Sequence, residues 1–243
     1  MIHVTPSFCA ANDTPGYREW PSTSGLIRTC WRVLADRDGT WTTGGAEYWG
    51  LVFSENPDGA VNAQVIGPSV RPRPMTVRAG DLSWGVDFEP HVVGRGVVKS
   101  DIIDGDLDLL TEIVGERWWF TLGGVRLPVP RHDELDAAVE HMADAGALEL
   151  DPTVRTVLDG TEVDLSDRTV RRQFAQTTGL RRGQVAQIRR ARRAFALLQQ
   201  GMSPAEAAAA AGYADQAHMT RQLRILTGST PGALPGRDGF SMS

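Results

Sequence analysis

The pattern of hydrophobic and polar residues divides the chain into a part typical of strands and a part typical of helices. Before residue 90, short runs that mix β-branched, aromatic and polar residues are separated by Gly, Pro and Asp. These runs predict strands at 24–36, 47–54, 60–67 and 81–88. The sequence Glu-Asn-Pro-Asp-Gly between the second and third runs is a strong turn signal, so these two strands should form a hairpin.

The segment from 70 to 150 gives a more mixed pattern. The prolines of Val-Arg-Pro-Arg-Pro-Met at 70–75 favour an extended or irregular connection. Residues 111–122 fit a helix or a strand equally well, and the adjacent Trp118, Trp119 and Phe120 indicate core or an interface. Residues 131–150 predict a helix that ends at Gly146 and connects the two parts. Its narrow apolar stripe could pair with a second copy of the chain; the stripe consists of Leu135, Ala138, Val139 and Met142.

Residues 203–230 predict two helices joined by a glycine turn. Ser203 is placed to cap the first helix together with Glu206, and Gly212 supplies the left-handed turn. The second helix should begin near Asp215. Its spacing buries Met219, Leu223 and Leu226 and leaves Gln216, Thr220, Arg221 and Arg224 outward. This layout is typical of a helix-turn-helix whose second helix enters the DNA major groove, rather than of an ordinary helical hairpin.

A second unit of the same shape lies upstream, at residues 165–180. Ser166 is the predicted cap, Val170 and Phe174 are the buried positions, and Gly179 closes the helix. Arg168, Arg171 and Arg172 fall on the opposite side at helical spacing. The preceding residues include Asp159-Gly160, Thr161 and Val163, which predict a poor helix end and a loosely supported first unit.

An arginine-rich helix, predicted at 183–200, separates the two units. Its apolar stripe is Val185, Ile188, Ala191, Phe195 and Leu198, and Gly201 ends it. A helix of this length spans roughly 27 Å at about 1.5 Å per residue. That suits two helices held in successive major grooves, about 34 Å apart. For Arg189, Arg190, Arg192 and Arg193, a solvated helix face and DNA contact both stay open.

Residues 165–234 resemble the DNA-binding domain of AraC/XylS-type transcription regulators. The likeness rests on LSDRTVRRQF, the arginine-rich spacer, and GYADQAHMTRQLRILTGSTPGAL. Together with the strand and helix patterns above, it gives an α+β chain with three parts: a β-rich barrel or sandwich at 1–130, the connecting helix at 131–150, and an all-α double helix-turn-helix domain at 151–243. The resemblance implies that the β-rich domain is cupin-like. It also supports DNA reading by Arg168, Arg171, Arg172, Gln216, Thr220 and Arg221. Ala217 stands where the family often has a polar reader, so one contact should be missing.

The charge distribution agrees with this division. The whole chain has a net charge of −5, which alone argues against binding nucleic acid. Residues 1–150 hold 12 Lys and Arg against 22 Asp and Glu, whereas residues 151–243 hold 13 against 8. Between 168 and 224, eleven arginines face only two acidic residues, Glu206 and Asp215. A basic domain joined to an acidic one is expected of a phosphate-binding module with a separate sensor.

Catalytic and cofactor motifs do not emerge from the sequence. The five histidines form no metal-binding pattern, no phosphate-binding glycine loop occurs, and we expect neither metal nor cofactor. Asp101, Asp104, Asp106 and Asp108 lack the terminal Glu of a calcium loop and predict a solvated acidic loop. Cys9 and Cys30 should be small buried hydrophobic residues.

The sequence therefore predicts a sequence-specific DNA-binding transcription regulator that is not an enzyme. No signal pattern or run of about 18 apolar residues occurs, so we expect a soluble, cytoplasmic protein without membrane contact. Its partners would be double-stranded DNA, a small-molecule effector in the N-terminal domain and a second copy of the chain. Two alternatives stay open: an enzyme or small-molecule-binding β domain with an accessory helical part, and an interaction module whose acidic N-domain masks the basic C-domain.

Overall fold

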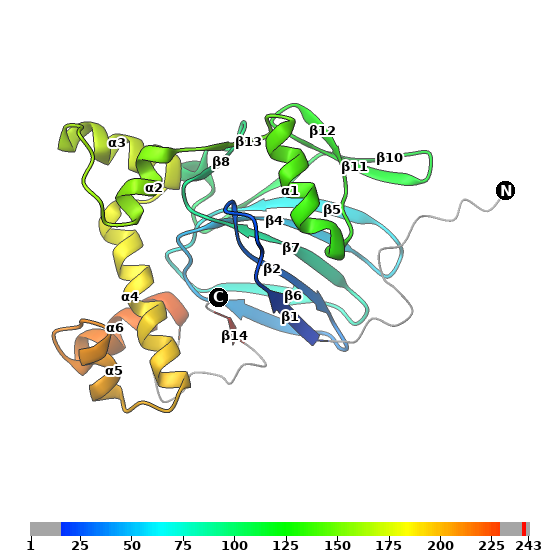
Figure 1. Ribbon diagram of the computed structural model, residues 1–243. Helices are drawn as coiled ribbons and strands as arrows, with labels where there is room; N and C mark the ends of the chain where they lie inside the picture. The colour runs from blue at the N-terminus through cyan, green and yellow to red at the C-terminus, as the bar shows by residue number, and fades with distance from the viewer. Residues whose placement is uncertain (1–15, 229–239, 242–243) are drawn as a thin grey trace.

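The computed structural model describes residues 16–228 and 240–241, in which a β-rich part is followed by a helical part (Figure 1). The strands are β1 (Gly16–Trp20), β2 (Ile27–Leu34), β3 (Gly39–Thr43), β4 (Trp49–Glu55), β5 (Val61–Ile66), β6 (Arg73–Val77), β7 (Leu82–Phe88), β8 (Val92–Gly94), β9 (Asp106–Leu109), β10 (Thr111–Val114), β11 (Arg117–Leu122), β12 (Val125–Pro128), β13 (Leu148–Leu150) and β14 (Phe240–Ser241). The helices are η1 (Lys99–Ile102), η2 (His132–Glu134), α1 (Leu135–Asp144), α2 (Pro152–Leu158), α3 (Asp167–Thr178), α4 (Arg182–Gln199), α5 (Pro204–Ala210) and α6 (Gln216–Thr227). The α+β fold class is confirmed.

The β part is built on a six-stranded antiparallel sheet in the order β1-β2-β7-β4-β5-β9. A smaller sheet in the order β14-β3-β6 lies beside it, and β10, β11 and β12 form a third sheet (Figure 1). The four strands predicted before residue 90 correspond to β2, β4, β5 and β7, and the predicted β4–β5 hairpin is present. The alternation of buried and partly exposed positions along these strands turns one face toward a common core.

Large aromatic side chains fill the core of the β part. Trp49, Phe53, Trp84 and Phe88 are each at most 1% exposed. Trp49 stacks on Phe88 with ring centroids 4.4 Å apart, and Phe53 lies 5.1 Å from the ring of Phe120. The indole N–H groups of Trp49 and Trp84 donate to backbone carbonyls, so their burial leaves no unpaired donor.

Three predictions about residues 70–150 need correction or completion. Of the extended and irregular alternatives at 70–75, the structure has the extended one: residues 73–77 form β6, an edge strand beside β3, where a proline costs no ladder hydrogen bond on its free side. Residues 111–122 form the β10–β11 hairpin, which settles the choice between helix and strand. The acidic loop is not simply solvated, because Asp104 accepts hydrogen bonds from the backbone N–H groups of Val70 and Arg71.

The connecting helix is shorter than predicted, and its apolar stripe is not free. Helix α1 covers 135–144, and residues 148–150 form β13, which pairs with β8. Leu135, Val139 and Met142 are at most 2% exposed and belong to the β core. Since this chain already covers the stripe, the expectation that it pairs with a second copy is wrong.

Cys30 is fully buried in the β core, as predicted, and burial raises the pKa of its thiol to about 12. Cys9 and His3 lie outside the described residues, as does most of the Gly-Ser-Thr-Pro-Gly-Ala-Leu ending. Across 16–228 and 240–241, no group of three His, Cys, Asp or Glu side chains could hold a metal ion. No helix in the same ranges is both long and apolar enough to cross a membrane.

Candidate nucleic-acid interface

Helices α2 and α3 form the first helix-turn-helix, and one carboxylate joins them. Asp151 caps α2 by accepting from the N–H of Val154 at 3.0 Å. The same carboxylate accepts from Gln173 at 2.9 Å and from Thr177 at 2.6 Å, and both residues lie on α3. Val154 is buried with Phe174 in the helical core. The first unit is therefore firmly supported, and the prediction of a poor helix end with loose support is wrong: α2 ends at Leu158, and the N–H of Asp159 donates to the carbonyl of Arg155.

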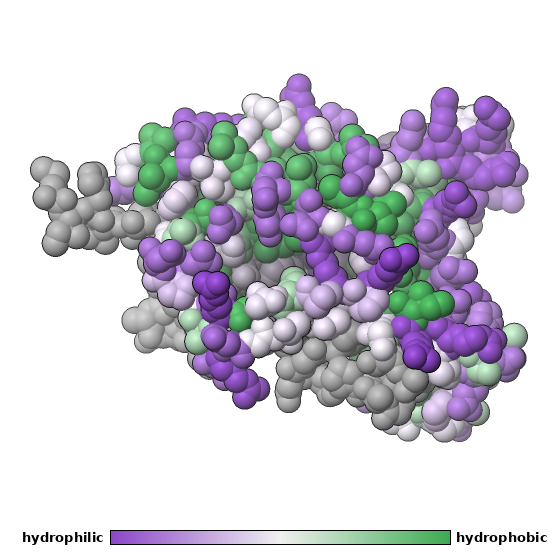
Figure 2. All heavy atoms as spheres, turned by 180° about the vertical axis from the view of Figure 1, so that it is seen from behind, coloured by the Kyte–Doolittle hydropathy of each residue, from purple (hydrophilic) through white to green (hydrophobic). Residues whose placement is uncertain are grey.

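The three arginines predicted to read DNA from the first unit lie on the exposed face of α3. Ser166 caps this helix through the N–H of Thr169, and Gly179 ends it in the left-handed conformation with φ of 76°. Arg168, Arg171 and Arg172 are all exposed. Figure 2 shows hydrophilic side chains gathered over this end of the molecule. The helix thus presents three guanidinium groups to solvent on the side opposite its core.

Helices α5 and α6 form the second helix-turn-helix. Ser203 and Glu206 make the predicted reciprocal capping box at the start of α5. Ala207 and Ala208 are buried, so α6 can pack closely against this small-residue helix. Gly212 turns the chain with φ of 79°. These observations confirm the predicted construction of this unit.

Helix α6 carries the second set of predicted reading residues. Asp215 caps it through the N–H of His218 at 2.6 Å. Gln216 and Arg221 are exposed, whereas Thr220 is half-buried. The ring of His218 packs edge-on against Tyr213, with ring centroids 5.3 Å apart.

Helix α4 separates the two units, which lie toward its opposite ends (Figure 1). Its 18 residues correspond to roughly 27 Å of helix at about 1.5 Å per residue. Val185, Ile188 and Ala191 are at most 3% exposed and form one core with residues from both units. The helical part therefore has a single continuous core, which holds α3 and α6 in fixed positions along α4.

Three of the five arginines on α4 contact other parts of the chain. Arg192 donates to both carboxylate oxygens of Glu47, at 2.9 and 2.7 Å, and Arg189 donates to Glu47 at 3.2 Å. Arg190 lies over the ring of Tyr213 at 4.8 Å. Arg193 is exposed, as is Arg182 at the start of the helix. A solvated face is thus the wrong description of Arg189, Arg190 and Arg192, whose contacts hold the protein together.

Glu47 belongs to the segment before β4, so these bonds join the β part to the helical part. It is 1% exposed. Burial alone would raise the pKa of Glu47, but the charge and hydrogen bonds of Arg192 hold that pKa below its ordinary value. Two further contacts reinforce the junction: the N–H of Gly45 donates to the carbonyl of Leu226 at 2.8 Å, and Gly179 lies against Lys99.

Sequence reasoning missed Asp151 and Glu47. The Asp-Pro pair at 151–152 is a standard helix start, so capping rules could have identified Asp151 as a cap. Glu47 had no such signal, because its partners lie more than 140 positions away in the sequence. Long-range ion pairs of this kind follow from the packing of the two parts.

Residues 160–236 match a family model described as a helix-turn-helix domain, which covers α3 to α6 and under a third of the chain. A solved structure, ToxT from Vibrio cholerae, aligns over 88% of this chain and 96% of its own, with 7% sequence identity and a TM-score of 0.39. No curated protein matches the chain.

Proposed function

We propose that this chain, a DNA-binding transcription regulator with an AraC-type helix-turn-helix domain, reads two adjacent major grooves with α3 and α6. The observation that carries the proposal is a repeated construction. Each unit has a seven-residue helix, α2 or α5, followed by a capped twelve-residue helix. The predicted reading residues on the two longer helices are exposed, except Thr220, which is half-buried. Helix α4 keeps the two units apart.

On α3, the reading residues would be Arg168, Arg171 and Arg172. A guanidinium group can donate two hydrogen bonds to O6 and N7 of guanine, which is the commonest specific contact in the major groove. The three side chains are exposed, and within residues 16–228 Arg171 donates only to the carbonyl of Asp167 on its own helix. They can therefore reach a base or a phosphate without breaking a contact to another element.

On α6, the reading residues would be Gln216, Thr220 and Arg221. The side chain of Gln216 suits N6 and N7 of adenine, and Arg221 suits guanine. Ala217 offers no polar group at the adjacent exposed position, so a base there would be read by its shape or its methyl group. The N–H groups at the starts of α3 and α6 would meet phosphates.

The domain division that accompanies this proposal places sensing at 1–130, connection at 131–150 and DNA binding at 151–243. We propose that the β part sets how the reading units are presented, through its contacts with α4 and α6 at Glu47 and Gly45. The protein would act on double-stranded DNA in the cytoplasm. A second copy of the chain, if it binds, would use a surface other than the buried stripe of α1.

A mobility-shift titration tests the proposal. The purified chain and the double variant Arg168→Ala/Arg221→Ala are titrated against DNA from upstream of the protein's own gene, with unrelated DNA of equal length as competitor. We expect the wild-type chain to prefer its upstream DNA and the variant to lose that preference. Equal binding of both DNAs by the wild-type chain would contradict sequence-specific recognition.

A further inference from the structure

A cavity of about 260 Å³ lies where the β part meets the helical part. The interior of the β part itself is filled by Trp49, Trp84 and other large aromatic side chains. The junction cavity is lined by Gly25 from the β1–β2 turn, Glu89 and His91 from the β7–β8 turn, Arg155, Leu158 and Asp159 from α2 or its end, and Arg189 from α4. Residues from both the β part and the helical part therefore line the cavity.

His91 is the first sign that this cavity takes a ligand. The residue is 6% exposed, and its Nε2 atom has no hydrogen-bond partner among the described residues. A buried polar atom without a partner is uncommon and costs stability. Burial, helped by the charge of Arg155, lowers the pKa of His91, so the ring is neutral near pH 7. A neutral imidazole nitrogen can either donate or accept, depending on its tautomer.

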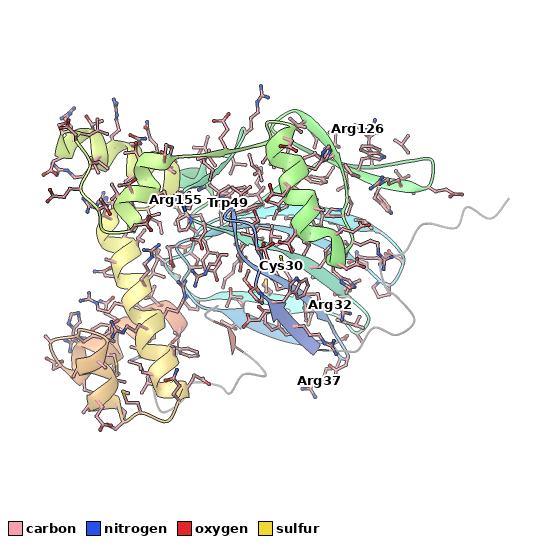
Figure 3. All side chains as sticks on the ribbon, viewed as in Figure 1. Cys30, Arg32, Arg37, Trp49, Arg126 and Arg155 are labelled. Atoms are coloured by element: carbon pink, nitrogen blue, oxygen red, sulfur yellow. The ribbon has the colours of Figure 1, made fainter. Side chains whose placement is uncertain are left out.

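The charged groups around the cavity are the second sign. The side chain of Arg155 makes no hydrogen bond or ion pair within 16–228, and Figure 3 shows it on α2 at the junction with the β part. The carboxylates of Glu89 and Asp159 are also without such a bond in that range. Arg189, in contrast, is held by Glu47 and by the carbonyl of Leu158. The cavity thus offers unpaired groups of both signs.

These groups select the chemical class of the ligand. A simple anion near Arg155 would also lie close to two carboxylates, and a simple cation would lie close to two guanidinium groups. A molecule with both a carboxylate and an amine can satisfy both sets. The volume is below the roughly 300–1,000 Å³ of pockets for drug-sized ligands, so the molecule must be small.

We propose that the junction cavity binds a small amphoteric metabolite of amino-acid size, its carboxylate bound by Arg155 and its amine by Glu89 and Asp159. The Nε2 atom of His91 would complete its hydrogen bonds. Such a ligand contacts the β part and α2 at once, so its binding favours the conformation in which these two parts enclose the cavity. The further consequence, that it changes DNA affinity, rests on the proposed function.

Thermal unfolding of the full chain, without DNA, tests the binding. Each common amino acid is added in turn at millimolar concentration to the wild-type chain, to Arg155→Ala and to Arg193→Ala. Arg155 is exposed on α2, so its replacement leaves the core intact, and Arg193 is an exposed arginine outside the cavity. We expect at least one amino acid to raise the Tm in a concentration-dependent way.

The variants decide whether that effect belongs to the cavity. Arg193→Ala should keep the rise in Tm, and Arg155→Ala should lose it. A wild-type chain that no amino acid stabilises, or an equal rise in Arg155→Ala, would overturn the proposal. Repeating the mobility shift with the bound amino acid should change DNA affinity about 5- to 150-fold. Since the melts contain no DNA and the titration above contains no amino acid, failure of one proposal is distinguishable from failure of the other.

Discussion

The carboxylate of Glu47 receives hydrogen bonds from both terminal nitrogens of Arg192, at 2.9 and 2.7 Å. This bidentate pair joins the β part to the helix that spaces the two helix-turn-helix units. The side chain of Glu47 is 1% exposed and that of Arg192 is 14% exposed, so solvent screens the pair little. An arginine of the basic domain is thus used for internal architecture rather than for DNA.

Replacing Glu47 with Ala should destabilise the chain by about 3–5 kcal/mol, because the charge of Arg192 would remain buried without a partner. Chemical denaturation measures this loss. Glu112→Ala is a matched control, since its ion pair with Arg126 is nearly half exposed and should contribute less than about 1 kcal/mol. Similar losses in the two variants would contradict the importance given to the junction pair.

The same pair should make stability depend on pH. The pKa of Glu47 is lower in the folded chain than in the unfolded one, so the folded state gains stability above the unfolded pKa. That gain is lost as pH falls through the folded pKa. Denaturation of wild type and Glu47→Gln from pH 7 down to pH 3 should therefore give a difference that shrinks with acidification. A difference that stays constant over this range would show that the charge of Glu47 is not responsible.

Much of the helical part could be predicted from the sequence, because capping residues, glycine turns and apolar spacing are local signals. Ser166, Ser203 and Gly212 play the roles predicted for them. The roles of α1 and of the α4 arginines could not be predicted. An apolar stripe such as Leu135 and Val139 has the same sequence pattern whether it packs on its own domain or on another copy of the chain. Likewise, the sequence does not distinguish an arginine that faces DNA from one that faces Glu47.

Gly179 shows how closely α3 approaches the β part. Its φ of 76° is unfavourable for other residues, and a Cβ atom there would lie 2.9 Å from the Cβ of Lys99. Gly201 also has a positive φ, of 87°, but no atom lies within 4 Å of its Cβ position. Gly201→Ala should cost about 1–2 kcal/mol from backbone strain alone, and Gly179→Ala should cost more in thermal or chemical unfolding. Equal costs would mean that α3 does not contact η1 so closely.

Arg221→Ala distinguishes base contact from phosphate contact at the second unit. If Arg221 reads a base, the variant should lose about 1–3 kcal/mol of specific binding and relax the preference at one base pair. Binding to a set of singly substituted DNA sites measures both effects. Uniformly weaker binding to every site, with the base preference unchanged, would assign Arg221 to a phosphate instead.

The central claim is that α3 and α6 both read DNA, and the length of the protected DNA tests it most directly. A footprint of the wild-type chain on its upstream DNA is compared with that of the triple variant Arg168→Ala/Arg171→Ala/Arg172→Ala. All three residues are exposed, so the variant should fold. Two reading units predict that the variant's footprint is shorter at one end by about one helical turn, roughly 10 base pairs. A full-length footprint with the variant would contradict the account, since α3 would then not be a reading helix.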